Sequence, residues 1–172
     1  MCGILCILNK VPLKLDYFIE QLSKLQHRGQ NSFGFCYPKN NKMEITNIRG
    51  LIKNYIPNNL SIYSNIFMGH TRYITSGTKD NDIPLPIKCK NKFGEFVFIF
   101  NGNIDLDKYN KKFSRTFEVD TLLIKDFLEN CSECDSFEKI DVTSVPRLHF
   151  HRVYGLIMNP LFSLSRLLTN LK

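Results

Sequence analysis

The sequence of 172 residues predicts an α+β fold, with sheet and helices packed in layers. Short apolar stretches that end at Gly, Pro or Asn dominate the first hundred residues and are typical of strands. Two further stretches, residues 16–26 and 120–130, have apolar residues at helical spacing and predict helices. With 43% hydrophobic and 23% charged residues and no run of roughly 20 apolar residues, the chain is expected to be one soluble domain.

The chain begins with a predicted strand and a predicted helix. Residues 2–8 are apolar enough for a buried strand, which we expect to end before Pro12. Residues 16–26 follow as an amphipathic helix, and Asp16 is the expected N-cap.

Three further strands are predicted in the next part of the chain. Residues 32–37 and 44–48 are expected to pair through a hairpin turn at Asn40 and Asn41, and residues 65–68 form a short strand. The prolines and polar residues of 78–86 indicate a surface loop.

The second half begins with the most apolar stretch, residues 93–100, a strand that we expect to end at the Asn-Gly dipeptide 101–102. Residues 120–130 follow as a helix, with Asp120 as a plausible N-cap. Residues 142–172 show no pattern that assigns them to a helix or a strand.

The net charge of +7 and the pI near 9.1 raise the question of nucleic-acid binding. The basic residues are scattered and form no block of five or more like charges. We therefore expect a solvated basic surface, with no nucleic-acid partner and no membrane association.

The six cysteines do not follow a disulfide framework. Cys131 and Cys134 have the C-x-x-C spacing, but a structural zinc site needs a comparable second pair. Cys2 and Cys6 lie four apart on a predicted strand, which is poor geometry for chelation. We expect free thiols in a reducing cytoplasm, without a signal peptide, metal or cofactor.

Cys2 becomes the N-terminal residue if Met1 is removed, and an N-terminal cysteine carries its own base. A free α-amine has a pKa near 7.7–8.0, so it can accept the thiol proton and leave a thiolate nucleophile. A cysteine at the second position is usually incidental, so this feature needs support from elsewhere in the sequence.

Asn101 and Gly102 allow two interpretations. Asn-Gly is a common turn dipeptide, and by itself a turn is the simpler interpretation. The alternative is an oxyanion site formed by the Asn101 side-chain amide and the Gly102 backbone N–H. Glycine favours the alternative because its backbone can approach a ligand closely.

Three other residues also allow a structural or a functional role. Arg72 is either a surface arginine or a fork that binds a carboxylate at two points. Asp120 is either a helix N-cap or the partner of a substrate ammonium group. His70 is interpreted as a packed, hydrogen-bonded histidine rather than a general base, since the α-amine of Cys2 supplies a base.

The motifs, taken in order, resemble those of class II glutamine amidotransferases, most of all the glutaminase domain of amidophosphoribosyltransferase, which acts in purine biosynthesis. They are MCGI at residues 1–4, LQHRGQNSFG at 25–34, GHTRY at 69–73, NGNI at 101–104 and VDT at 119–121. The resemblance covers about residues 1–129, and it is the ordered set of motifs that makes it specific.

The resemblance implies an N-terminal-nucleophile hydrolase fold, an αββα sandwich of two stacked sheets. Cys2, exposed by removal of Met1, would attack the side-chain amide of glutamine, and Asn101 with Gly102 would hold the oxyanion. The γ-glutamyl thioester would then be hydrolysed to glutamate, with release of ammonia.

The resemblance also implies the residues that bind glutamine. Arg72 would bind the α-carboxylate, Asp120 the α-ammonium, and Arg28, Gly29 and Thr75 would line the pocket. No cofactor is implied, and a separate synthase subunit would accept the ammonia.

The chain departs from the family in several respects, one of which is Phe33 in place of a usual small residue. Phe100 stands where the amidophosphoribosyltransferase branch usually has histidine, and the asparagine synthetase branch resembles this chain at that position. Family members continue through a long second half of the sandwich and a synthase domain, whereas 52 residues follow Asp120 here and 142–172 are atypical. We therefore expect one amidotransferase domain spanning 1–172, with a sandwich truncated on its C-terminal side. The alternative function is an inactive remnant that binds glutamine or a partner.

Overall fold

The computed structural model describes most of the chain. It covers residues 2–56, 61–74, 83–92, 94–104, 106–114, 116–130, 151–158 and 164–168. The sequence predictions for Thr75, Cys131 and Cys134 lie outside the described residues.

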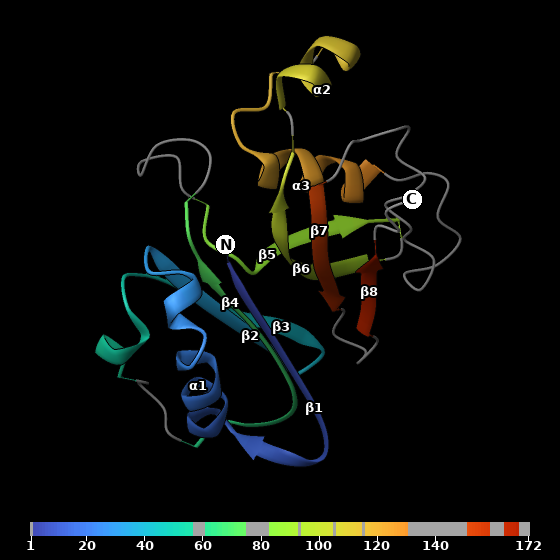
Figure 1. Cartoon of the computed structure of the whole chain (residues 1–172). Helices are drawn as coiled ribbons and strands as arrows, with labels where there is room; N and C mark the ends of the chain where they lie inside the picture. The colour runs from blue at the N-terminus through green and yellow to red at the C-terminus, as the bar shows by residue number, and fades with distance from the viewer. Residues whose placement is uncertain are drawn as a thin grey trace.

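The described strands form two four-stranded antiparallel sheets (Figure 1). The first sheet has the order β1-β4-β2-β3 and consists of β1 (Gly3–Lys14), β4 (Tyr63–Arg72), β2 (Ser32–Lys39) and β3 (Lys42–Arg49). The second has the order β5-β6-β7-β8 and consists of β5 (Ile87–Asn91), β6 (Gly94–Asn103), β7 (His151–Met158) and β8 (Leu164–Leu168). The α+β fold class predicted from the sequence is therefore confirmed.

Helix α1 (Leu15–Ser23) covers the outer face of the first sheet. Its buried side chains Phe18 and Leu22 pack on this sheet, where Phe18 stacks on Phe67 at 5.0 Å between ring centroids. Gly69 of β4 lies directly beneath the helix, and a Cβ there would come within 2.8 Å of Phe18. The helix and the sheet thus approach each other closely because this position has no side chain.

A second core joins the two sheets and α3 (Asp120–Asn130). Ile66 and Met68 of β4 and Phe96 and Phe98 of β6 are buried in it, together with α3 residues such as Leu123. Since α3 contacts β5, the order of layers is α1, first sheet, second sheet, α3 (Figure 1).

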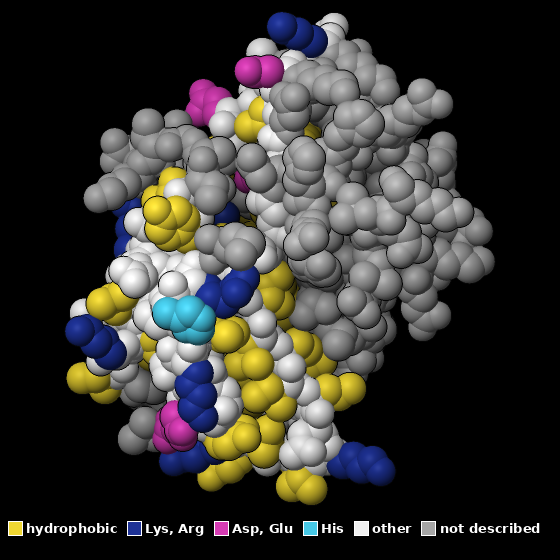
Figure 2. All heavy atoms as spheres, in the orientation of Figure 1, with side chains coloured by type: hydrophobic (Ala, Val, Ile, Leu, Met, Phe, Trp, Pro, Cys, Tyr) yellow, Lys and Arg dark blue, Asp and Glu magenta, His cyan; other side chains and the backbone are white. Residues whose placement is uncertain are grey.

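Strand β1 is longer than predicted. It continues through Pro12 to Lys14, and its pairing with β4 is irregular between Leu8 and Leu13. The predicted end before Pro12 was wrong because β1 lies at the edge of its sheet, where a missing N–H costs no ladder hydrogen bond. Leu8 and Val11 of this strand remain exposed. Figure 2 shows hydrophobic side chains on the surface over β1.

The predicted N-cap of the first helix was also wrong. The helix begins at Leu15, after Lys14, and Asp16 lies in its first turn, where it forms an ion pair with Lys14 at 2.9 Å. The Leu15 N–H donates to the Ile62 carbonyl instead, at 2.9 Å, so no side-chain cap is needed for it. The helix ends at Ser23, before the predicted limit of 26, and a short 3-10 turn, η1 (Gln26–Arg28), follows.

Other sequence predictions for the elements had mixed outcomes. The hairpin turn between β2 and β3 is confirmed: Asn40 and Asn41 have φ angles of 51° and 58°, the left-handed region that asparagine tolerates. The turn interpretation of Asn101 and Gly102 was wrong, because β6 continues through both to Asn103. Four described strands and α-helices were not predicted: β5, α2 (Leu106–Phe113), β7 and β8. The short 3-10 turn η2 (Ile52–Asn54) was not predicted either.

Within the described residues, no helix is long and apolar enough to cross a membrane. The same residues contain no cluster of three or more side chains suited to hold a metal ion.

Candidate active site

Cys2 lies immediately before β1, at the end of the first sheet that faces β6, and 8% of its surface is exposed. The next residue, Gly3, pairs with Thr71 of β4, and its N–H donates to the Thr71 hydroxyl at 3.2 Å. That hydroxyl donates in turn to the Leu25 carbonyl at 3.1 Å. Thr71 therefore ties the backbone next to the cysteine to the segment that follows α1.

The backbone of Tyr73, just after β4, faces the Cys2 sulfur. Its N–H donates to Sγ at 3.4 Å, and its carbonyl lies 3.6 Å from Sγ, where it can accept the thiol proton. An N–H aimed at sulfur stabilises a thiolate, because the developing negative charge strengthens the hydrogen bond. The backbone of Tyr73 can therefore hydrogen-bond the Cys2 sulfur both as a thiol, through its carbonyl, and as a thiolate, through its N–H.

Asn101 comes from the second sheet to the same place. The Cys2 backbone nitrogen donates to Asn101 Oδ1 at 3.2 Å, across 99 residues of sequence. Because this bond occupies the carboxamide oxygen, it directs the Nδ2 donors of Asn101 elsewhere. Gly102 follows at an irregularity in the pairing with β7, between Asn101 and Asn103.

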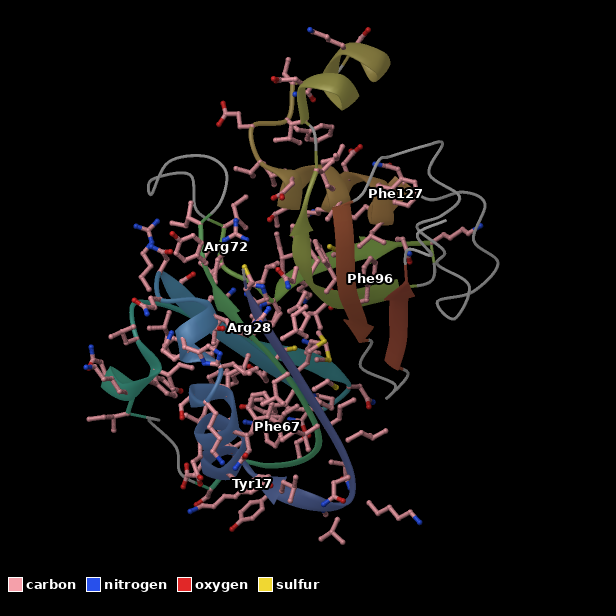
Figure 3. All side chains as sticks on the ribbon, viewed as in Figure 1. Tyr17, Arg28, Phe67, Arg72, Phe96 and Phe127 are labelled. Carbon is pink, nitrogen blue, oxygen red and sulfur yellow. The ribbon has the colours of Figure 1, made fainter. Side chains whose placement is uncertain are left out.

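Arg28 and Gly29 approach the cysteine from the 3-10 turn η1. Arg28 Nε donates to the Cys2 carbonyl at 3.1 Å, and Figure 3 shows Arg28 and Arg72 near the start of β1. Gly29 packs against the backbone of β4: a Cβ there would lie 2.5 Å from the Thr71 carbonyl carbon and oxygen. The close approach of this loop to β4 therefore requires glycine.

Arg72 and Asp120 are both buried, with 5% and 2% of their surface exposed. Burial raises the pKa of Asp120, and the positive charge of Arg72 opposes that shift in pKa. The two side chains are therefore close enough to interact, although one belongs to β4 and the other begins α3. Buried charged groups with shifted pKa values are found more often at functional sites than elsewhere, so this pair belongs to the candidate site.

His70 lies in the interior, between the two sheets. Burial lowers the pKa of His70 to about 3, and the nearby positive charge of Arg72 adds to that effect. The ring is therefore neutral at physiological pH, in line with its interpretation as a packed, hydrogen-bonded histidine.

The structure brings most of the predicted site residues together. Cys2, Asn101 and Arg28 share hydrogen bonds, and Gly29 lies against the backbone of Thr71 and Arg72. Thr75 lies outside the described residues.

Sequence reasoning assigned no role to Tyr73, Thr71 and Asn31. Asn31 Oδ1 accepts from the Ile74 N–H at 3.1 Å, which ties the loop after η1 to the segment after β4. Tyr73, Thr71 and Asn31 all stand inside the motifs GHTRY and LQHRGQNSFG, but each of their contacts joins a backbone group to a residue far away in the chain, which the sequence does not reveal.

Comparison with known proteins gives relatives of two kinds. The chain is 33% identical over 111 residues to a glutamine–fructose-6-phosphate aminotransferase of Sulfolobus acidocaldarius, a match that covers 60% of this chain and 18% of the relative. It is 29% identical over 153 residues to the same enzyme of Streptococcus agalactiae (81% and 24%) and 28% identical over 107 residues to the amidophosphoribosyltransferase of Escherichia coli (60% and 21%). The chain is a homologue of the class II glutamine amidotransferase domain.

Solved structures agree with this assignment at the level of the fold. A glutamine phosphoribosylpyrophosphate amidotransferase from B. subtilis superposes with a TM-score of 0.68 at 24% identity, over 92% of this chain and 35% of that one. A structure described as the allosteric regulatory enzyme of purine biosynthesis gives 0.70 at 21% identity, over 93% and 36%. The amidotransferase homologue described here thus spans about a fifth to a third of its relatives' length, and no family model matches it.

Proposed function

We propose that this chain is a glutaminase domain that hydrolyses glutamine to glutamate and ammonia. The observation that carries the proposal is the hydrogen bond from the Cys2 nitrogen to Asn101 Oδ1, 3.2 Å long, which joins the candidate nucleophile to the candidate oxyanion site. The homology to class II amidotransferase domains supports the same reaction.

Cys2 is the proposed nucleophile once Met1 has been removed. Its nitrogen then becomes an α-amine, already placed beside Asn101, and it accepts the thiol proton. The Tyr73 N–H, 3.4 Å from Sγ, stabilises the thiolate that results.

The thiolate attacks the side-chain amide carbon of glutamine and forms a tetrahedral oxyanion. Asn101 Nδ2 and the Gly102 N–H are the proposed donors to that oxygen. The C–N bond then breaks, and the leaving nitrogen takes the proton from the α-ammonium group of Cys2 and departs as ammonia. Water cleaves the thioester, which releases glutamate and restores the thiol.

Glutamine is held, in this proposal, by its α-carboxylate and α-ammonium groups. Arg72 binds the first through its planar fork of donors, and Asp120 binds the second. Arg28, Gly29 and Thr75 line the site. Two charged contacts hold one end of glutamine, so its side-chain amide points toward the sulfur. Binding energy at the amino-acid end thus orients the amide for attack.

The ammonia is proposed to pass to a separate synthase subunit in the cytoplasm. The relatives found here include enzymes whose names refer to fructose 6-phosphate and enzymes of phosphoribosyl transfer, so the acceptor differs among them. The reaction proposed for this chain needs no cofactor, because the thiol, the amine and water supply all the groups that react.

The test is glutamate release from glutamine by the purified wild-type chain and by Cys2→Ala, with intact mass measured on the same samples. We expect turnover only in the wild type, with a mass that lacks the initiator methionine. Equal rates in both proteins would refute the proposal. Saturable glutamine binding without turnover would favour the alternative, a remnant that binds glutamine but does not hydrolyse it.

A further inference from the structure

His70 lies on the face of β4 that is directed at the second sheet. Side chains alternate along a strand, so Met68, His70 and Arg72 share one face. Met68 belongs to the core between the sheets, whereas its neighbour Phe67 belongs to the core beneath α1. His70 therefore stands on the inner face, between that core and the buried charge of Arg72.

The imidazole of His70 makes one hydrogen bond within the described residues, and it crosses between the sheets. Nε2 lies 3.0 Å from the Phe100 carbonyl oxygen of β6. A carbonyl can only accept, so Nε2 carries the hydrogen of the neutral ring. Nδ1 is buried and has no partner among the described residues. The ring is thus a fixed donor, with no second contact through which it could relay a proton.

The Phe100 carbonyl, which accepts this bond, lies where the pairing of β6 with its two neighbouring strands changes. The pairing of β5 with β6 extends to Phe98, two residues before it, and the pairing with β7 becomes irregular just after Asn101. The Phe100 carbonyl and the Asn101 N–H belong to one planar peptide group. The hydrogen bond from His70 therefore restrains the orientation of the whole Phe100–Asn101 peptide plane, and with it the direction in which Asn101 points toward Cys2.

We propose that His70 is a positioning residue, which orients the Phe100–Asn101 peptide so that Asn101 and Gly102 face the Cys2 sulfur. Because His70 stands two residues before Arg72 on β4, it links the strand that binds the substrate carboxylate to the strand that binds the oxyanion. This inference rests on the proposed glutaminase function. Misplacement of such a group by about 1 Å can reduce turnover about a hundredfold.

Two substitutions of His70 separate the effect of its hydrogen bond to Phe100 from the effect of the volume that its side chain fills. In His70→Gln, the amide Nε2 lies as many bonds from Cβ as the imidazole Nε2, so it can still donate to Phe100. His70→Leu fills the space but removes the donor. Met68→Ala is the matched control, because it disturbs the same core between the sheets without touching the bond to Phe100.

The kinetic measurement is glutamine hydrolysis with kcat and KM determined separately on folded protein. We expect His70→Leu to lower kcat about tenfold to a hundredfold with little change in KM, and His70→Gln to recover kcat to within about threefold of the wild type. Met68→Ala should lower Tm while kcat is retained. The inference is overturned if His70→Leu and Met68→Ala lower kcat equally, or if His70→Gln shows no recovery.

A second measurement keeps the inference testable if the wild type shows no turnover, which would refute the proposed function alone. In ¹H–¹⁵N spectra of the full chain, His70→Leu should shift the Asn101 and Gly102 amide signals, and His70→Gln should return them toward wild-type positions. Unchanged Asn101 and Gly102 signals in His70→Leu would show that His70 does not orient this segment.

Discussion

The two sheets contribute chemically different halves of the candidate site. The first sheet and its loops supply the thiol and the two cationic side chains, from Cys2, Arg28 and Arg72. The second sheet and its helix supply the amide group of Asn101 and the carboxylate of Asp120.

The halves also differ in how they are built. In the first, Tyr73 and Arg28 donate hydrogen bonds to Cys2, and the Thr71 hydroxyl accepts one from the adjacent Gly3 N–H, so the cysteine is fixed by groups of its own half. Hydrogen bonds between the sheets join the second half to the first at the candidate site, from Cys2 to Asn101 and from His70 to Phe100. The candidate nucleophile is therefore positioned by groups of its own half, whereas the candidate oxyanion site depends on the packing of one sheet on the other.

The largest effect is expected from the second half. Asn101→Ala should lower kcat for glutamine hydrolysis about 10²–10³-fold, because it removes a donor to the oxyanion. The control is Asn91→Ala, which removes another asparagine of the second sheet, one that donates to the Leu128 carbonyl at 3.4 Å. A similar loss of kcat in both variants would mean that Asn101 affects turnover only by stabilising the second sheet, and not by donating to the oxyanion.

Arg72 tests whether the first half binds the substrate. Arg72→Lys keeps the charge but loses the two-point fork, so KM for glutamine should rise about tenfold to a hundredfold. Arg49→Lys, at an exposed position of β3, should leave KM unchanged. If KM does not move in Arg72→Lys while Asp120 remains intact, Arg72 serves only as the buried partner of that carboxylate.

Gly29 tests how closely the loop after α1 must approach β4. Gly29→Ala should destabilise the chain by about 1–3 kcal/mol, since the new Cβ would overlap backbone atoms of Thr71 that cannot rotate away. Denaturant unfolding measures the effect. Gly50→Ala is the contrast: a Cβ meets nothing within 4 Å there, and the cost comes from a φ of 100° alone. If Gly29→Ala leaves the free energy of unfolding unchanged, the loop lies farther from β4 than the structure shows.

A smaller effect concerns the pH dependence of stability at the contact between the halves. The pKa of His70 is about 3 in the folded chain and near 6.5 when unfolded, so below pH 6.5 the unfolded state binds a proton that the folded state does not. Stability is therefore lost as the pH falls. Between pH 7 and 4.5, the wild type should lose about 2 kcal/mol more than His70→Gln, measured by urea unfolding at each pH. Parallel curves would show that His70 titrates normally.

Much of the first half could be predicted from the sequence. The helix after β1, the β2–β3 hairpin and the start of the nucleophile strand follow from local spacing and turn residues. The errors came where tertiary contacts overrode a local signal: Pro12 is tolerated at a sheet edge, and the Ile62 carbonyl replaces a side-chain cap at α1. For Asn101 and Gly102, a common turn dipeptide continues a strand because β7 pairs with it from 50 residues further along.

The amino-acid sequence alone shows which chemical groups are present and in what order: the second-position cysteine, the basic and amide motifs, and the aspartate that begins α3. The tertiary structure decided which of them meet. Only the packed sheets bring the nitrogen of residue 2 to the amide of residue 101, and burial in the fold is the main cause of the low pKa of His70 and of the raised pKa of Asp120. The physical reason is that charge and hydrogen-bond energies depend on the surrounding medium and on distances set by the whole fold, which no local stretch of sequence contains.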